Sequence, residues 1–210
     1  MESPGARPRA GLRCVWAVRS ILAAMDEATS VTPALVGTVR TIHRGRVFSV
    51  EEVRYRTEGG AELLRDVVRH PGAVTVIPVL GDGRLVMIRN WRVAVGGWLD
   101  EFCAGKLEPG EDPAVAAARE LEEETGHAAG AVRKVGTFFT SPGFADERMH
   151  VFEATDLRAV PRRLEEGERI EVVVRTVAEV ERMVQDGSIQ DGKTIGAFAI
   201  WRLGRMGAPA

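Results

Sequence analysis

The sequence predicts an α+β protein in which a mixed β-sheet is flanked by helices. Short β-rich runs separated by turns fill much of the chain from residue 36 onward. One helical segment with an unusual acidic cluster lies near the middle, and two more helical segments follow late in the chain. A chain of 210 residues is long enough for one good core, so we expect one domain plus extensions.

Composition limits the classes of function. The chain is 45% hydrophobic and 28% charged, which is typical of a soluble globular protein. Its net charge of −2 gives no basis for general binding to nucleic acids or membranes. No apolar run approaches the roughly 18 residues of a membrane span. Cys14 and Cys103 form no disulfide framework, which favours a reducing, cytoplasmic location.

Residues 1–35 differ from the rest and are predicted to be an N-terminal extension that is disordered or partly helical. Residues 1–13 are rich in proline, glycine and arginine, and residues 12–28 can form a short amphipathic helix. A signal peptide is the alternative, because arginines precede an apolar segment. Arg19 interrupts that segment, so the extension is favoured. Another alternative is that Met25 is the true start.

The first strands are predicted over 36–42, 46–56 and 62–69, where apolar and polar residues alternate. Gly59-Gly60 forms a hairpin turn between the last two. These runs predict a small N-terminal antiparallel β subdomain over 36–69.

A stronger hairpin follows, with strands at 73–80 and 84–89 joined by Gly81-Asp82-Gly83. Pro78 indicates a sheet edge or a bulge in the first of these strands. Later strands are expected at 132–140, 148–154 and 170–176, and the last two helices at 177–185 and 193–203.

The central helix has clear ends. Asp112 suits the N-cap, Pro113 the first helical position and Gly126 the left-handed position after the last turn. Small or apolar residues at helical spacing predict the face that packs on a sheet. They are Ala114, Ala117, Ala118, Leu121 and Thr125.

Glu120, Glu123 and Glu124 lie on one side of this helix, within an arc of about 100°. Like charges at this spacing repel one another, so the cluster requires a counter-charge. Mg²⁺ or Mn²⁺ suits it, because these ions prefer carboxylate oxygens and keep waters and phosphates as further ligands. Gly105 and Gly110 bracket a sharp loop that can bring a backbone carbonyl beside the carboxylates.

These residues together resemble the Nudix box, the signature of the Nudix hydrolases. The matching positions are Gly105, Glu111, Arg119, Glu120, Leu121, Glu123, Glu124 and Gly126. The departure is His127, where the family usually has an aliphatic residue. An ordinary solvated acidic helix is the alternative, but all eight fixed positions of the pattern are met.

The resemblance extends over residues 36–205 to the ADP-ribose pyrophosphatase branch, through HPGAVTVIPV, RNWRVAVGGWLDEFCAGKLEPGE, SPGFADERMHVFEA and IQDGKTIGAFAIW. In that branch, a proline 16 residues beyond the last box glycine marks a preference for ADP-ribose, and Pro142 stands there. A simple turn proline is the alternative. The resemblance implies an α/β/α sandwich, with a Nudix domain over 70–206 and a homodimer that exchanges the 36–69 subdomain.

The resemblance also implies a set of metal ligands. Glu120, Glu123, Glu124 and the carbonyl of Ala104 would hold two to three Mg²⁺ or Mn²⁺ ions. Structural roles in the motif fall to Gly105, Glu111, Arg119 and Gly126. Arg119 reaches Glu123 at i+4 and can orient the acid cluster, and Glu111 is expected to hydrogen-bond within the loop.

Catalytic and substrate-binding residues are implied outside the helix. For the general base we choose Glu168 first and Glu166 second, in the acidic loop at 164–169; a solvated loop is the alternative. Glu123 completes the catalytic set. Substrate-binding residues are Arg65, Arg92, Glu147 and Pro142; each charge could instead be a plain surface charge.

The implied activity is metal-dependent hydrolysis of the pyrophosphate bond of ADP-ribose, giving AMP and ribose 5-phosphate. The partner would be a small nucleoside diphosphate derivative, with no nucleic acid or membrane involved. One alternative is a pyrophosphatase for GDP-mannose or another nucleoside diphosphate sugar. The other is a non-catalytic sensor that binds ADP-ribose.

Overall fold

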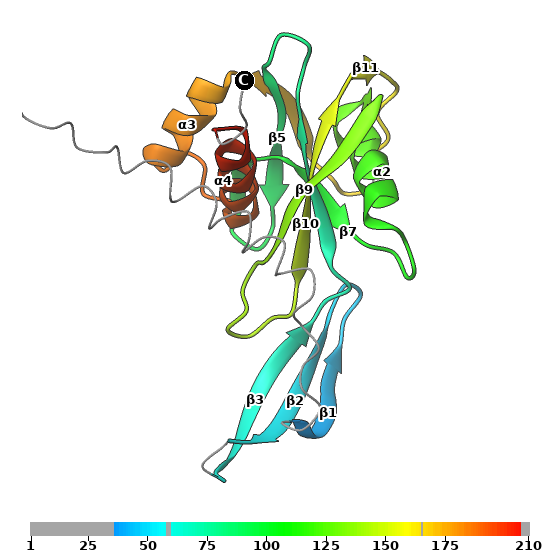
Figure 1. Cartoon of the computed structure of the whole chain (residues 1–210). Helices are drawn as coiled ribbons and strands as arrows, with labels where there is room; N and C mark the ends of the chain where they lie inside the picture. The colour runs from blue at the N-terminus through cyan, green and yellow to red at the C-terminus, as the bar shows by residue number, and fades with distance from the viewer. Residues whose placement is uncertain (1–35, 58–59, 165, 207–210) are drawn as a thin grey trace, which may run out of the picture.

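The computed structural model describes residues 36–57, 60–164 and 166–206. The predicted N-terminal extension over 1–35, including the possible helix at 12–28, lies outside the described residues, as does Gly59 of the predicted hairpin turn. Within the described part, the fold is α+β, as predicted. Figure 1 shows helix α2 on one side of the central strands, α3 and α4 on the other, and strands β1–β3 apart from both.

The predicted strands and helices occur in the predicted order, together with four strands that were not predicted. The strands are β1 (Val36–Arg44), β2 (Ser49–Arg56), β3 (Glu62–Arg69), β4 (Ala73–Pro78), β5 (Leu85–Arg92), β6 (Gly97–Glu101), β7 (Cys103–Lys106), β8 (His127–Ala128), β9 (Ala131–Phe139), β10 (Arg148–Thr155), β11 (Arg158–Ala159) and β12 (Ile170–Arg175). The helices are α2 (Pro113–Thr125), α3 (Val177–Gln185) and α4 (Gly192–Met206).

The central sheet is mixed. Its strand order is β7-β4-β10-β9, with β4 and β10 parallel and the other neighbours antiparallel. A second core sheet, in the order β12-β5-β6, is antiparallel. The β1-β2-β3 sheet is also antiparallel, as predicted for residues 36–69. A short β11-β8 pair completes the described strands.

Two apolar clusters fill the space between sheets and helices. One lies under α3 and α4 and includes Phe102, Val180, Phe198 and Trp201. The other lies under α2 and includes Val76, Cys103, Leu121 and Phe152. Burial of apolar side chains on both sides makes the central strands the interior layer of the domain.

The prediction from Pro78, a sheet edge or a bulge, is met only in part: β7 pairs with β4 as far as Val76, so at Pro78 the ladder partner is β10 on the other side. Strand β4 lies inside the sheet, between β7 and β10, and its register with β10 runs without a bulge. Pro78 is the last residue of the strand, and the next residue, Val79, resumes backbone pairing by donating its N–H to the Ala154 carbonyl at 2.8 Å. A proline at a strand end removes no hydrogen bond from the strand interior, so it is tolerated there.

The packed face of α2 was predicted only in part. Ala117, Leu121 and Thr125 are buried, but Ala114 is exposed and Ala118 only partly covered. The remaining buried positions are Ala116 and Glu124. The helix therefore lies against β7 and β4 with an acidic side chain inside its contact face.

Strands β6 and β7 were not predicted. The strand sequences GWLDE and CAGK contain no β-branched residue and no regular alternation. Pairing with β5 and β4 holds these residues extended. This pairing brings Ala104 and Gly105 alongside the acidic helix.

No helix in the described part of the chain is long and apolar enough to cross a membrane.

Candidate active site

Helix α2 begins and ends where the sequence predicts. Asp112 accepts a hydrogen bond from the Ala114 N–H at 2.7 Å, and Pro113 occupies the first turn. Gly126 has a φ of 69°, which favours glycine, and its N–H donates to the Glu122 carbonyl at 3.0 Å. These caps fix the position of the carboxylates along the helix.

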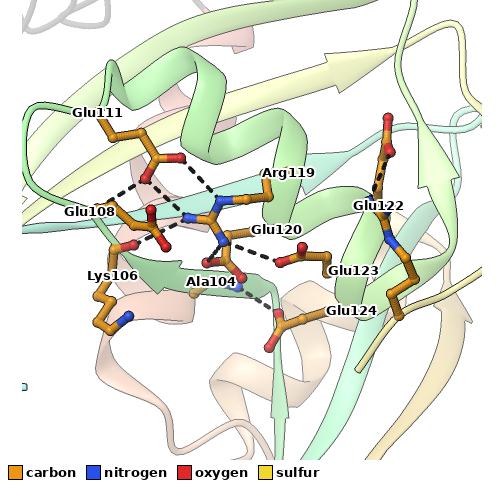
Figure 2. A network of polar contacts seen from close by, with 10 residues as sticks. Ala104, Lys106, Glu108, Glu111, Arg119, Glu120, Glu122, Glu123 and Glu124 are labelled. Atoms are coloured by element: carbon orange, nitrogen blue, oxygen red, sulfur yellow. Dashed lines mark hydrogen bonds and ion pairs between the residues drawn. The ribbon is translucent and has the colours of Figure 1, made fainter. Parts of the chain in front are cut away.

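Arg119 is the counter-charge of the acidic helix in this structure (Figure 2). Its guanidinium donates to Glu120 at 2.7 Å and to Glu123 at 3.2 Å. The same group binds Glu111 through two nitrogens, at 3.0 and 3.1 Å. The predicted contact with Glu123 is therefore confirmed, within a larger network than one pair.

Glu111 closes the loop in front of the helix. Its carboxylate accepts the N–H of Glu108 at 3.0 Å as well as the bonds from Arg119, as predicted for a residue that hydrogen-bonds within the loop. Hydrogen bonds from Arg119 and the Glu108 backbone lower the pKa of Glu111. The loop and the helix are thus joined by one salt-bridged unit.

Gly105 lies where the carboxylate of Glu120 meets strand β7. A Cβ atom added at Gly105 would lie 1.8 Å from Oε1 of Glu120. Only a residue without a side chain lets this carboxylate rest against the strand backbone. The motif glycine therefore creates the space for the acid.

Glu124 is the most deeply buried acid of the cluster, with 3% of its surface exposed. Its Oε2 accepts the N–H of Ala104 at 2.9 Å. Burial raises the pKa of Glu124 to about 8, and the charges of Glu120 and Glu168 act in the same direction. Burial also raises the pKa of Glu120, although Arg119 opposes this shift.

A cavity of about 410 Å³ opens beside these carboxylates. Acidic residues from several elements line it, together with Arg92 from β5, Lys106 from β7 and Lys193 from α4. The lining residues also include Ala104, Glu120, Glu147 and Glu168. Acidic and basic side chains therefore share one cavity, an arrangement that suits a bound cation together with an anionic ligand.

The comparisons with known proteins agree with the motif. A family model described as "NUDIX domain" matches residues 69–195. The chain belongs to the Nudix family. The predicted family is therefore confirmed, and so is the prediction that the protein is an enzyme, a Nudix pyrophosphohydrolase.

The chain is 39% identical over 168 residues to a protein named "ADP-ribose pyrophosphatase" from Bacillus subtilis (strain 168), covering 77% of this chain and 90% of the relative. It is 35% identical over 164 residues to a protein of the same name from Mycobacterium tuberculosis (strain ATCC 25618 / H37Rv), and this match covers 76% of this chain and 79% of the relative. A solved structure titled "Crystal structure of ADP compounds hydrolase" has a similar fold, with a TM-score of 0.73 at 24% identity, covering 86% of this chain and 99% of that chain.

The Nudix carboxylates fit a hard divalent cation. In the described part of the chain, no three His, Cys, Asp or Glu side chains are already gathered around a metal position. Glu120 and Ala104 nevertheless line one cavity wall, with Glu124 hydrogen-bonded to Ala104 behind it. Mg²⁺ commonly takes one or two carboxylates and completes its shell with waters and substrate phosphates, so this oxygen donor set is sufficient.

The other predicted site residues divide into two groups. Glu168, Arg92 and Glu147 line the cavity of the Nudix domain. Three others do not line it. Glu166 and Pro142 are exposed on loops, and Arg65 lies on the β1–β3 sheet, 6.0 Å from the ring centre of Tyr55.

Glu101 and Lys193 were missed by the sequence reasoning. Glu101 is fully buried and binds both Arg92 and Lys193, and Lys193 lines the cavity. The two lie 92 positions apart in sequence. Nothing in the local sequence pattern indicates their contact, because it depends on packing of α4 against the end of β6.

Proposed function

We propose that this Nudix protein hydrolyses the pyrophosphate bond of ADP-ribose, giving AMP and ribose 5-phosphate. The observation that carries the proposal is the cavity, where Glu120 of the Nudix helix shares the lining with Arg92 and Lys193, and the buried Glu124 lies behind Ala104 of the same lining. A diphosphate is both anionic and a good partner for divalent cations, so it suits a space lined by both acidic and basic side chains. The relatives named ADP-ribose pyrophosphatase support this choice of nucleotide.

In this proposal Glu120, Glu123, Glu124 and the Ala104 carbonyl hold two to three Mg²⁺ or Mn²⁺ ions. When bound, such ions neutralise phosphate charge and lower the pKa of a bound water. Glu120 and Glu123 each bind Arg119 through one oxygen in this structure, at 2.7 and 3.2 Å, so each would bind an ion through its second oxygen. Arg119 keeps its bonds to Glu111 and so maintains the helix and loop geometry.

Glu168 is the proposed general base. It lies on the cavity wall, and its negative charge raises the pKa of both Glu120 and Glu124, so it is close to the acid cluster. A half-buried carboxylate in this position can take a proton from the attacking water. Glu166 is exposed on the same loop, which favours Glu168 of the two predicted candidates.

Arg92 and Glu147 are proposed to bind the substrate in the same cavity, which both of them line. Pro142 lies on the exposed loop that precedes Glu147, where we propose that it shapes the substrate preference. Arg65 lies on the β1–β3 sheet, away from the cavity of its own chain. A homodimer that exchanges this sheet would bring Arg65 to the partner's cavity. Exposed apolar residues on or beside the β1–β3 sheet support such an interface: Val39, Ile42, Val47, Phe48 and Leu64.

The test is a substrate screen with purified full-length protein, stripped of metal and then given Mg²⁺ or Mn²⁺. ADP-ribose, GDP-mannose and NADH are compared by release of AMP or GMP. We expect ADP-ribose to be cleaved fastest and only with a divalent cation. Faster cleavage of GDP-mannose would instead indicate a GDP-mannose pyrophosphatase. A relative of that name, from Escherichia coli O139:H28 (strain E24377A / ETEC), is 34% identical to this chain over 147 residues. Tight binding of ADP-ribose without cleavage would indicate a sensor.

A further inference from the structure

Glu101 is a buried carboxylate that joins two cations of the cavity wall. Arg92 donates to it through Nε at 2.8 Å and through Nη2 at 2.6 Å. The Nζ of Lys193 donates to the same Oε2 at 2.6 Å. One carboxylate from β6 therefore holds a guanidinium from β5 and an ammonium from α4 side by side.

Glu101 is buried more deeply than the two cations that it binds. Glu101 has no exposed side-chain surface, whereas 39% of Arg92 and 15% of Lys193 is exposed. Both cations line the cavity that the acidic helix borders. An anion that enters the cavity therefore meets the positive groups before the carboxylate behind them, and their attraction is little screened in a partly buried space.

The contacts described here use only part of the hydrogen-bonding capacity of the two cations. Arg92 offers further N–H groups beside the two that bind Glu101. Lys193 contacts Glu101 and, at 2.8 Å, Asp191, and an ammonium has a further donor. Both can therefore bind a phosphate oxygen without losing Glu101.

The backbone around Lys193 is fixed to the strand that carries Glu101. Asp191 accepts the N–H of Thr194 at 2.9 Å in the first turn of α4. The hydroxyl of Thr194 in turn accepts the N–H of Phe102 at 3.0 Å, and Phe102 directly follows Glu101. These bonds fix the position of Lys193 relative to Glu101 before any ligand binds, which reduces the entropic cost of binding.

Lys193 also lies where two cavities meet. A second cavity, of about 480 Å³, lies between the end of β9 and the start of α4, and Lys193 and Glu147 line both. Phe138 and Phe139 line the second cavity and give it apolar surface. A cation at this junction is well placed for the charged middle of a ligand with a sugar on either side.

We propose that Lys193 binds a phosphate oxygen of the substrate together with Arg92, and that Glu101 is the positioning residue for both cations. This inference rests on the proposed function and deepens it, since it assigns two further residues to the same site. Lys193 contacts the phosphate in the ground state and the transition state alike. Its loss should therefore raise KM much more than it lowers kcat.

The experiment compares Lys193→Gln, Glu101→Gln and the double variant by steady-state kinetics with ADP-ribose. We expect each single variant to raise KM about tenfold or more while kcat changes little. If Glu101 acts through the cations, the double variant should be less impaired than the product of the single effects. Lys193→Arg should restore much of the affinity.

Arg84→Gln is the matched control, because Arg84 pairs with Asp82 in an exposed hairpin turn. Its KM should equal that of the wild type. A KM within twofold of the wild-type value for Lys193→Gln would overturn the assignment, as would a fall in kcat and thermal stability without a change in KM. If the wild type cleaves another nucleoside diphosphate sugar instead, the proposed substrate is wrong, and the same KM comparison with that compound still decides the role of Lys193.

Discussion

The N–H of Ala104 donates a hydrogen bond of 2.9 Å to Oε2 of Glu124, which joins strand β7 to helix α2 (Figure 2). Ala104 immediately precedes the motif glycine, and Glu124 immediately precedes the last buried residue of the helix. One oxygen of Glu124 is thereby fixed by the backbone.

Replacing Glu124 by glutamine should lower kcat by about a thousandfold or more. Glutamine retains an oxygen that can accept the Ala104 N–H but carries no charge for a metal ion, so the fold should remain intact. Steady-state kinetics and a thermal melt test both parts. Glu122→Gln is the control, because Glu122 lies on the same helix but pairs with Arg163 at 3.8 Å. A Glu124→Gln enzyme with nearly full activity would refute the metal assignment.

Replacing Arg119 by lysine should lower the free energy of unfolding by about 1–3 kcal/mol. Lysine keeps the charge, but its single ammonium group cannot replace the planar guanidinium group that binds Glu111, Glu120 and Glu123 through several nitrogens. Urea unfolding in a metal chelator measures the loss. Added Mg²⁺ should stabilise the variant more than the wild type, because the variant's acids retain a weaker counter-charge. Equal stabilisation of both proteins would argue against Arg119 as their main counter-charge.

Replacing Gly105 by alanine should impair activity much more than stability. The new Cβ would lie 1.8 Å from Oε1 of Glu120, so the carboxylate must move away from the strand. Because that atom is at the end of a flexible side chain, the backbone need not change. We expect kcat to fall about tenfold or more and the melting temperature to change little. Gly81→Ala, in a hairpin turn with open space around the position, is the control; equal losses in both variants would contradict this account.

The acidic helix could be predicted because its signals are local. Asp112, Pro113 and Gly126 mark its ends, and the three glutamates follow from their spacing on one helix. Strands β6 and β7 could not be predicted, since their extended conformation depends on pairing with β5 and β4 rather than on β-branched residues. Lys193 and Glu101 show the same limit for the site, because their contact spans 92 positions and forms only when α4 packs against β6.

Glu153 should make stability depend on acidity. Burial opposes its ionisation, but hydrogen bonds from Trp201 and Arg133 and the charges of Arg133 and Arg205 outweigh burial, so its pKa lies below the usual 4.5. A lowered folded-state pKa stabilises the protein above about pH 4.5, and this stability is lost as pH falls through the folded-state pKa. Glu153→Gln should therefore cost about 1–2 kcal/mol at pH 7 and less at pH 3.

Urea unfolding of the wild type and Glu153→Gln at both pH values measures this difference. Glu181→Gln serves as the control, because Glu181 pairs with Arg202 on a more exposed surface and should have little effect at either pH. A destabilisation by Glu153→Gln that grows on acidification would have the wrong sign for this mechanism.

Asp146 should hold the β1–β3 sheet on the Nudix domain. Its carboxylate accepts the His70 N–H at 2.8 Å and pairs with Arg69 at 3.1 Å, and its own N–H donates to the Val68 carbonyl at 3.1 Å. Asp146→Ala removes the two side-chain contacts and keeps the backbone contact. We expect faster amide hydrogen exchange across 62–70, while the strands around Ile77 and Met87 exchange as in the wild type.

Asp66→Ala is the matched control for this effect, because Asp66 is an exposed residue on the same strand, β3. Its exchange pattern should match the wild type throughout. If Asp146→Ala accelerates exchange equally in both sheets, Asp146 stabilises the whole fold rather than the junction. If the sheet must stay docked to present Arg65 across a dimer, the same variant should also raise KM for ADP-ribose. Metal affinity should stay unchanged, because the Asp146 carboxylate contacts Arg69 and His70 and neither Glu120 nor Glu124.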